Sequence, residues 1–232
     1  MAILNDNKVI VLDQLPIELE AGTILKQMKI HGDARRFETP LLELFEVLRP
    51  LARPKALIKV VCVDHKTPES LQIDGITFDS KLVRLQLDPV ETAFVCMTTV
   101  GTEVESIEPP RDVIKRFCLD AIKNHLLFIA TSGLKKFLQE TYQTGTLTNL
   151  NPGETDSFPI IEQRKIFQII GDVEGYIGVR LSENCALIPT KSHSGIYFST
   201  EVEFISCRLC TNQRCQGRRA PYEPELAQRY KH

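Results

Sequence analysis

Three cysteines stand within nine residues in the stretch CRLCTNQRCQGRRAPY, close to the C-terminal end of the sequence. Cys207, Cys210 and Cys215 have the spacing C-x2-C-x4-C, and the first two match a metal knuckle, in which a tight turn directs two sulfur atoms at one ion. The same stretch contains Arg208, Arg214, Arg218 and Arg219. Nearby positive charge lowers the pKa of a thiol and favours an anionic metal–thiolate centre. We therefore predict a metal site in this tail.

The sequence leaves two alternatives for the identity of the metal and several for the identity of its fourth ligand. Closely spaced cysteines suit a [4Fe–4S] cluster, and the same residues suit a structural zinc ion. The tail has no further cysteine, so a fourth ligand has to come from elsewhere in the chain. Cys185 is the first candidate, because it lies in a loop region close to the segment 189–195; the others are Cys62, Cys96 and His193. The rival interpretation is a mobile tail with three reduced thiols.

The composition is that of a globular protein. Of the 232 residues, 43% are hydrophobic and 25% charged, which is enough to bury a core. The formal net charge of −2 argues against a nucleic-acid partner bound by phosphate neutralisation. No apolar run reaches the roughly 18 residues that span a bilayer, and the first residues lack the basic region of a signal peptide. We expect a cytoplasmic protein without a membrane partner, with thiols that are reduced or bound to metal.

The spacing of apolar residues predicts the main elements. A helical pattern follows Pro109-Pro110 and runs to Tyr142; its middle is apolar on all sides, which is typical of a helix at the centre of a core. Gly133 within it predicts a kink or a break. A second helix is predicted over residues 158–170. Strands are predicted at residues 8–12, 56–65, 81–87, 92–101, 177–181 and 195–205, with a hairpin turn at Asp74-Gly75 and a loop over 144–158.

Hairpins thus come first, then helices, then further strands. This order predicts the α+β class, with a largely antiparallel twisted sheet and packed helices. We expect one such domain over residues 1–206, followed by a Cys/Arg-rich metal-binding tail over residues 207–232.

Residues 149–198 carry several motifs in a fixed order. They are Pro152-Gly153, Glu162-Gln163, the pattern Gly178-Val179-x-Leu181-x-Glu183, and the pattern Pro189-x-x-Ser192-x-Ser194-Gly195. In this order the motifs resemble the activation domain of cobalamin-dependent methionine synthase and its stand-alone relatives. The resemblance covers roughly residues 35–205.

The resemblance implies a function and a set of contacts. Domains of this family bind S-adenosylmethionine and support the reductive remethylation of cobalamin that has been oxidised to the cob(II)alamin state. A corrinoid-carrying methyltransferase, or another corrinoid protein, is then the expected partner. The residues expected at the cofactor are Gly153, Glu154, Ser192, Ser194 and Tyr197.

The sequence departs from the family pattern in the binding loop. The family has an Arg four residues before its Gly, followed by Gly-Tyr-Pro, whereas this chain has Asn149 and then Gly153-Glu154-Thr155. An Asn does not replace an Arg that pairs with a carboxylate. Glu154 is able to attract a sulfonium cation instead.

Two functions from different classes follow. The first is an accessory protein that aids reductive reactivation of cobalt in a corrinoid-dependent methyltransferase, with S-adenosylmethionine as the methyl donor in doubt. The second is a non-catalytic binding or assembly module that keeps the fold and uses the cysteines as a structural zinc site. Motifs for nucleoside triphosphates or dinucleotides are absent from the sequence.

Overall fold

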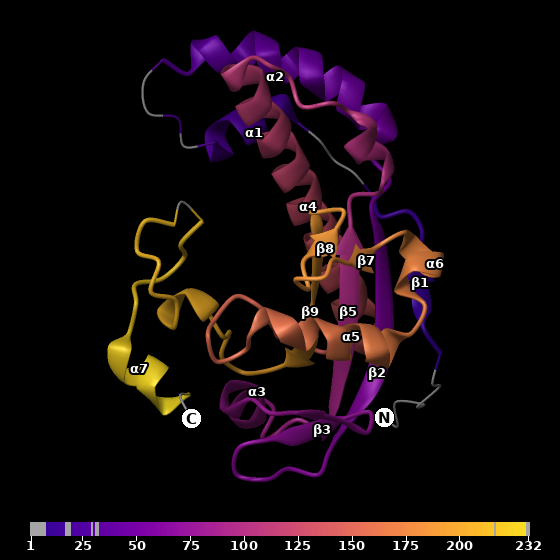
Figure 1. Ribbon diagram of the computed structural model, residues 1–232, viewed down its shortest axis with the longest axis vertical. Helices are drawn as coiled ribbons and strands as arrows, with labels where there is room; N and C mark the ends of the chain where they lie inside the picture. The colour runs from indigo at the N-terminus through magenta and orange to yellow at the C-terminus, as the bar shows by residue number, and fades with distance from the viewer. Residues whose placement is uncertain (1–7, 17–19, 29, 31–32, 216, 231–232) are drawn as a thin grey trace.

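The computed structural model describes residues 8–16, 20–28, 30, 33–215 and 217–230. In this part of the chain an antiparallel sheet of seven strands forms the centre of the molecule, in the order β4-β3-β2-β5-β9-β6, with β1 also paired to β2 (Figure 1). The strands are β1 (Ile10–Leu12), β2 (Lys55–Asp64), β3 (Leu71–Ile73), β4 (Ile76–Phe78), β5 (Thr92–Thr99), β6 (Leu147–Leu150) and β9 (Ser192–Ser199). A separate pair consists of β7 (Arg180–Leu181) and β8 (Leu187–Ile188). The α+β class with an antiparallel sheet is confirmed.

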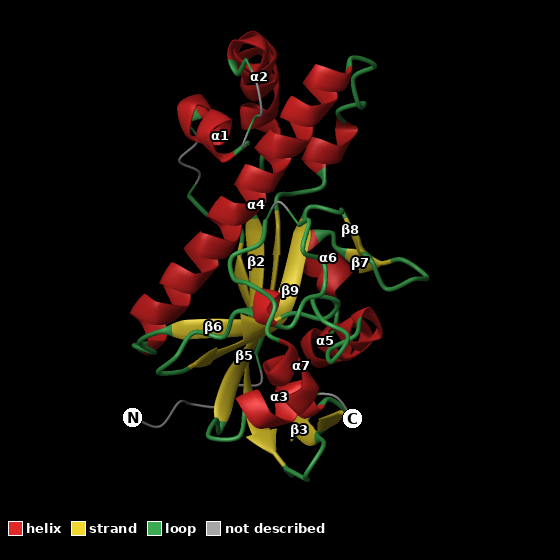
Figure 2. Cartoon of the chain, turned by 90° about the vertical axis from the view of Figure 1, so that its left-hand side faces the viewer, coloured by secondary structure: helices red, strands yellow, loops and turns green. Residues whose placement is uncertain are grey.

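Helices cover both faces of the sheet and extend beyond one end of it. They are α1 (Ala21–Gln27), α2 (Arg35–Leu48), α3 (Lys81–Gln86), α4 (Val113–Tyr142), α5 (Gln163–Ile170), α6 (Val173–Ile177) and α7 (Pro224–Arg229), with short 3-10 turns at Arg49–Leu51, Glu103–Ser106, Ile160–Glu162 and Ser206–Arg208. Figure 2 shows α4 running diagonally from α1 and α2 down to the end of β6. Among the described residues, none of these helices is both long and apolar enough to cross a bilayer.

Helix α4 joins two hydrophobic cores. Its first half, from Cys118 to Leu126, packs with α1 and α2 in a core outside the sheet. Its second half places Ala130, Leu134 and Leu138 against one face of the sheet. The prediction that the middle of this helix is buried on all sides is wrong, because one side of it faces solvent and Phe128 in the apolar stretch is 59% exposed. The helix begins at Asp112, whose side chain accepts a hydrogen bond from the backbone N–H of Lys115 at 2.9 Å.

The other face of the sheet carries a third hydrophobic core. Side chains of β2, β5 and β9 that point away from α4 pack there against α5, and the same core includes residues of α3, α6 and the C-terminal tail. The sheet is therefore buried on both faces. This explains why β5 is apolar along nearly its whole length, as predicted for residues 92–101.

Five sequence predictions are corrected by the structure. Gly133 neither kinks nor breaks α4, which is one continuous helix of 30 residues. Residues 81–87 form helix α3 and not a strand, because the buried Ser80 caps its first turn by accepting the N–H of Val83 at 3.2 Å. Residues 177–181 contain only the short strand β7, since α6 ends at Ile177. The predicted loop over 144–158 contains β6, and the last long strand covers 192–199 instead of 195–205.

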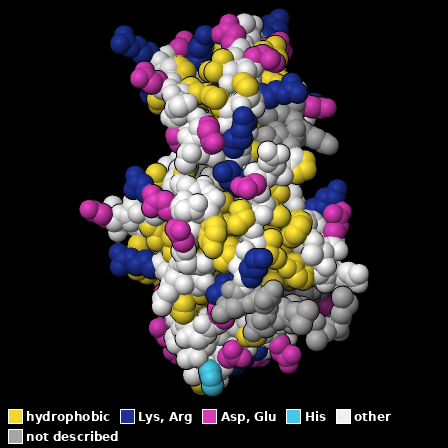
Figure 3. Space-filling model, turned by 90° about the vertical axis from the view of Figure 1, so that its right-hand side faces the viewer, with side chains coloured by type: hydrophobic (Ala, Val, Ile, Leu, Met, Phe, Trp, Pro, Cys, Tyr) yellow, Lys and Arg dark blue, Asp and Glu magenta, His cyan; other side chains and the backbone are white. Residues whose placement is uncertain are grey.

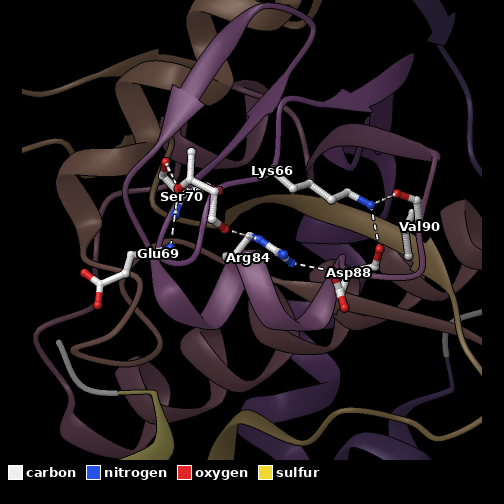
Figure 4. Close-up of polar contacts among 7 residues, drawn as sticks. Lys66, Glu69, Ser70, Arg84, Asp88 and Val90 are labelled. Atoms are coloured by element: carbon white, nitrogen blue, oxygen red, sulfur yellow. Dashed lines mark hydrogen bonds and ion pairs between the residues drawn. The ribbon is translucent and has the colours of Figure 1, made fainter.

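Polar contacts fix α3 to the loop after β2 (Figure 4). Arg84 donates to the carbonyl of Thr67 and pairs with Asp88 in the turn after the helix, while Lys66 donates to the carbonyls of Asp88 and Val90 at 2.6 and 2.9 Å. Arg84 thus ties the helix to the loop after β2, and Lys66 of that loop holds the segment that follows the helix. The hairpin predicted at Asp74-Gly75 is confirmed between β3 and β4, and both of its turn residues have positive φ.

Candidate functional site

The predicted cofactor contacts on β9 do not all point the same way. Successive side chains of a strand alternate between the two faces of a sheet. Tyr197 belongs to the core formed with α4, whereas Ile196 and Phe198 belong to the core formed with α5. Ser192 and Ser194 therefore share the α5 face, and Tyr197 lies on the opposite face. The structure does not bring the two serines together with the tyrosine.

The two serines are buried and bonded within the protein. Ser194 donates a short hydrogen bond to the side-chain oxygen of Gln163 at the start of α5, and Ser192 donates to the hydroxyl of Thr99 on β5 at 3.0 Å. Gln163 belongs to the acid/Gln pair that the sequence singled out. These contacts hold α5 and the end of β5 to β9.

The α4 face of β9 carries a group of polar residues, which we call the β9 cluster: Lys135, Asn149, Asn151, Glu154, His193 and Tyr197. Tyr197 is 1% exposed, and its hydroxyl lies 3.3 Å from Nδ1 of His193. Asn149 on β6 is paired in register with Tyr197, so their side chains stand on the same face.

A chain of side-chain amides joins β6 to the following loop. Asn149 donates to Asn151 at 2.9 Å, and Asn151 donates to the carboxylate of Glu154 at 2.7 Å. Asn151 lies so close to Gly195 that a Cβ atom there would overlap its side-chain oxygen and stand 2.8 Å from the carbonyl oxygen of Leu150. A glycine is therefore required at position 195 for this loop to pack on β9.

The loop that contains Glu154 is a tight turn with an exposed tip. Gly153 has a φ of 90°, which favours glycine, and its N–H donates to the carbonyl of Phe158 at 2.8 Å. The backbone of Gly153 and the carboxylate of Glu154 are exposed, so both are accessible to a ligand. Sequence reasoning named both residues, and the structure places them beside Asn151 in the β9 cluster.

Lys135 and His193 complete the cluster. Lys135 projects from α4, and its Nζ lies over the ring of Tyr197, 5.9 Å from the ring centroid. Burial lowers the pKa of His193 below its ordinary value; the carboxylate of Glu154 opposes this effect and the ammonium of Lys135 adds to it. Burial likewise raises the pKa of Tyr197 well above its ordinary value. The imidazole and the phenol are therefore both neutral at neutral pH.

The cysteine tail is ordered around one arginine. The guanidinium of Arg218 donates to four backbone carbonyls, those of Cys207, Cys210, Asn212 and Ala220, at 2.7–2.9 Å. Its Nε is buried without a hydrogen-bond partner among the described residues. The backbone N–H of Arg219 lies 3.4 Å from the sulfur of Cys207. The loop thus has a fixed backbone that carries thiols on its surface.

The tail also packs on the body of the protein. Leu209, Ala227 and Tyr230 belong to the core on the α5 face, and the hydroxyl of Tyr230 accepts a hydrogen bond from Gln86 of α3 at 2.7 Å. Arg208 forms a two-point ion pair with Glu223, at 2.6 and 2.8 Å. These contacts fix both ends of the cysteine loop.

The four predicted metal ligands are not gathered at one point. Cys185 is buried at a turn between β7 and β8, whereas Cys215 is exposed in the tail. Within the described residues, no three His, Cys, Asp or Glu side chains are grouped so that they could hold a metal ion. Metal binding by Cys207, Cys210, Cys215 and Cys185 stays a prediction.

One solved structure identifies the class of fold. It is entitled "Crystal Structure of the MetH Reactivation Domain bound to AdoHcy", and it matches this chain with a TM-score of 0.64 at 13% sequence identity, over 85% of this chain and 80% of that chain. No family model matches the sequence, and no curated protein matches it. The protein therefore has the fold of the MetH reactivation domain, and the resemblance found in the motifs is confirmed at the level of the fold.

Sequence reasoning did not single out Lys135, and it considered His193 only as a candidate metal ligand. A lysine on a helix is usually solvated, and nothing in its spacing marks it. The alternation within β9 was a usable signal, since residues 193, 195 and 197 must share one face.

The low pKa of His193 predicts a loss of stability in acid. A histidine that is neutral when folded and protonates freely when unfolded favours the unfolded chain once the pH falls below its unfolded pKa of about 6.5. We expect the free energy of unfolding to fall between about pH 7 and about pH 5, by at most roughly 1.4 kcal/mol per pH unit for this residue. Urea unfolding across this range measures it.

The matched control is His193→Gln, which should flatten the pH dependence. His125, whose pKa burial also lowers, should contribute independently through His125→Gln. An unchanged slope in His193→Gln would show that His193 is solvated in the folded protein.

Proposed function

We propose that this protein is an accessory factor that docks on a corrinoid-carrying methyltransferase and assists the return of oxidised cobalt to its active state. The observation that carries the proposal is the match in fold to the MetH reactivation domain over 85% of the chain. The β9 cluster supports it, because an exposed carboxylate and glycine backbone adjoin buried polar groups at the place where the motifs imply a ligand.

The reaction needs two contributions besides docking. Cobalt(II) has to gain one electron from a low-potential external reductant, and it has to receive a methyl group. When bound, S-adenosylmethionine supplies that methyl group. This chain contributes position, because holding two reactants in a reactive geometry accounts for much of the rate of such reactions.

The residues of the β9 cluster fit such a ligand at its cationic end. Glu154 offers a carboxylate to a sulfonium or ammonium group, and Gly153 allows a close approach of the backbone. Position 149 offers no positive charge, and the amide of Asn149 is engaged by Asn151. A carboxylate on the ligand therefore needs a positively charged residue from another helix or strand.

The surface charge agrees with a protein partner. On the face shown in Figure 3, acidic and basic side chains are interspersed and hydrophobic ones gather over the middle. A mixed, nearly neutral surface supports docking on a folded protein better than binding along a nucleic-acid backbone.

Docking is tested by calorimetry with the corrinoid-binding fragment of a cobalamin-dependent methionine synthase. We expect the fragment loaded with cob(II)alamin to bind, and to bind at least about tenfold more tightly than the fragment loaded with methylcobalamin, because only the first requires reactivation. Equal affinity for both loaded forms, or no binding to either, would contradict the proposal.

A second candidate function rests on the cysteine loop. We propose that Cys207, Cys210 and Cys215 hold a thiophilic metal centre. The arrangement around Arg218 supports this, because it fixes the backbone of the loop and leaves the buried Nε without an acceptor in the described part of the chain, which a thiolate or sulfide would supply. A [4Fe–4S] cluster would give the protein its own electron carrier. A zinc ion would instead stabilise the structure of the tail in a non-catalytic protein that binds or assembles with others.

Metal analysis of protein purified without oxygen separates these outcomes. Bound iron with equimolar sulfide and a broad visible absorbance supports the cluster, and one zinc ion per chain without colour supports the structural zinc site. Cys210→Ser should remove the metal, while Cys118→Ser, on helix α4, should keep it. Protein that remains free of metal after reconstitution with either ion would contradict the site.

A further inference from the structure

Lys135 stands where a ligand of the β9 cluster would meet positive charge. Register pairs Asn149 of β6 with Tyr197 of β9, so both side chains are on the face that α4 covers. The ammonium of Lys135 lies over the ring of that same Tyr197. The lysine therefore comes from a different element than position 149 but reaches the same face of the sheet.

The ammonium of Lys135 has no anionic partner in the described part of the chain. No carboxylate lies within 4.0 Å of it, whereas Lys123, Lys165 and Lys191 each have one. The side chain is half-buried, and burial lowers its pKa. The carboxylates of Glu203 and Glu154 raise that pKa and the guanidinium of Arg219 lowers it, so these charges surround Lys135 without contacting it. A half-buried cation without a partner is costly unless a ligand supplies the anion.

Arg219 and Glu203 form no ion pair with Lys135, and their opposite charges shift its pKa in opposite directions. They lie 3.6 Å from one another and form an ion pair of their own. Glu154 is bonded through one oxygen to Asn151, and its exposed carboxylate keeps a second oxygen for a ligand. The cluster thus presents one ammonium without an ion-pair partner and one carboxylate, and both charges act on His193.

We propose that Lys135 is the anion-binding residue of the β9 cluster, and that with Glu154 it recognises the zwitterionic amino-acid end of a ligand. Lys135 holds the ligand's carboxylate, and Glu154 faces its cationic group. The ligand class is then an α-amino acid or a molecule that ends in one, such as S-adenosylmethionine. This inference rests on the proposed function for the identity of the ligand, but the charge arrangement is a property of this chain alone.

Two ligands that differ only in the carboxylate test the assignment. Calorimetry with S-adenosylmethionine and with decarboxylated S-adenosylmethionine measures the preference for the carboxylate directly. We expect wild type to bind the first about tenfold or more tightly than the second, which is typical of one charge-assisted contact. Lys135→Met should abolish this preference, and Lys135→Arg should restore most of it.

Lys136→Met is the matched control, because Lys136 is the exposed neighbour and pairs with Glu140 on the helix surface. It should keep the wild-type preference. Thermal unfolding of each variant shows whether it is folded, so a loss of binding through misfolding is recognised. If wild type binds both ligands equally, binds neither, or keeps its preference in Lys135→Met, the assignment is wrong. Docking on the corrinoid fragment does not use Lys135 and is measured separately, so either proposal can fail alone.

Discussion

The alternation of side chains along β9 is the constraint on which the rest of the site depends. This strand lies between β5 and β6 in a sheet that is buried on both faces. Its side chains therefore belong alternately to two hydrophobic cores, one on each face of the sheet. The side with Ser192 and Ser194 anchors α5 and the end of β5, and the side with His193 and Tyr197 forms the polar cluster beneath α4. Gly195, between the last two, leaves the space that Asn151 occupies.

Helix α4 is the second determinant of the site. One continuous helix connects the outer core with α1 and α2 to the core on the sheet, so it carries Lys135 to a fixed place over Tyr197.

The C-terminal tail packs on the core at the other face of the sheet, the face that α5 covers. Arg218 holds the cysteine loop of this tail by hydrogen bonds to backbone carbonyls.

Much of this fold follows from the sequence. The Asp74-Gly75 turn, an apolar strand predicted at residues 92–101 and a helix that ends at Tyr142 are readable from local patterns, because turn chemistry and periodicity decide them. The break predicted at Gly133 is not present, since packing on both cores keeps the helix continuous. Helix α3 was not readable in this way, because a short segment with alternating polarity is compatible with a strand until Ser80 caps it. Gly153, Glu154 and Tyr197 are predicted as site residues through the motif, and that assignment stays a prediction. Lys135 was not predicted, because its meaning depends on which strand its helix crosses, and that is a tertiary fact.

The central claim is that the protein assists reactivation of cobalt in a partner. Its most direct test is the recovery of methyl-transfer activity by a cobalamin-dependent methionine synthase fragment that lacks its own reactivation domain and has been trapped with cob(II)alamin. With S-adenosylmethionine and a low-potential reductant present, addition of this protein should restore the visible spectrum of methylcobalamin together with turnover. If the fragment stays in the cob(II)alamin state with the protein present in excess, while an authentic reactivation domain restores it, the central claim is wrong.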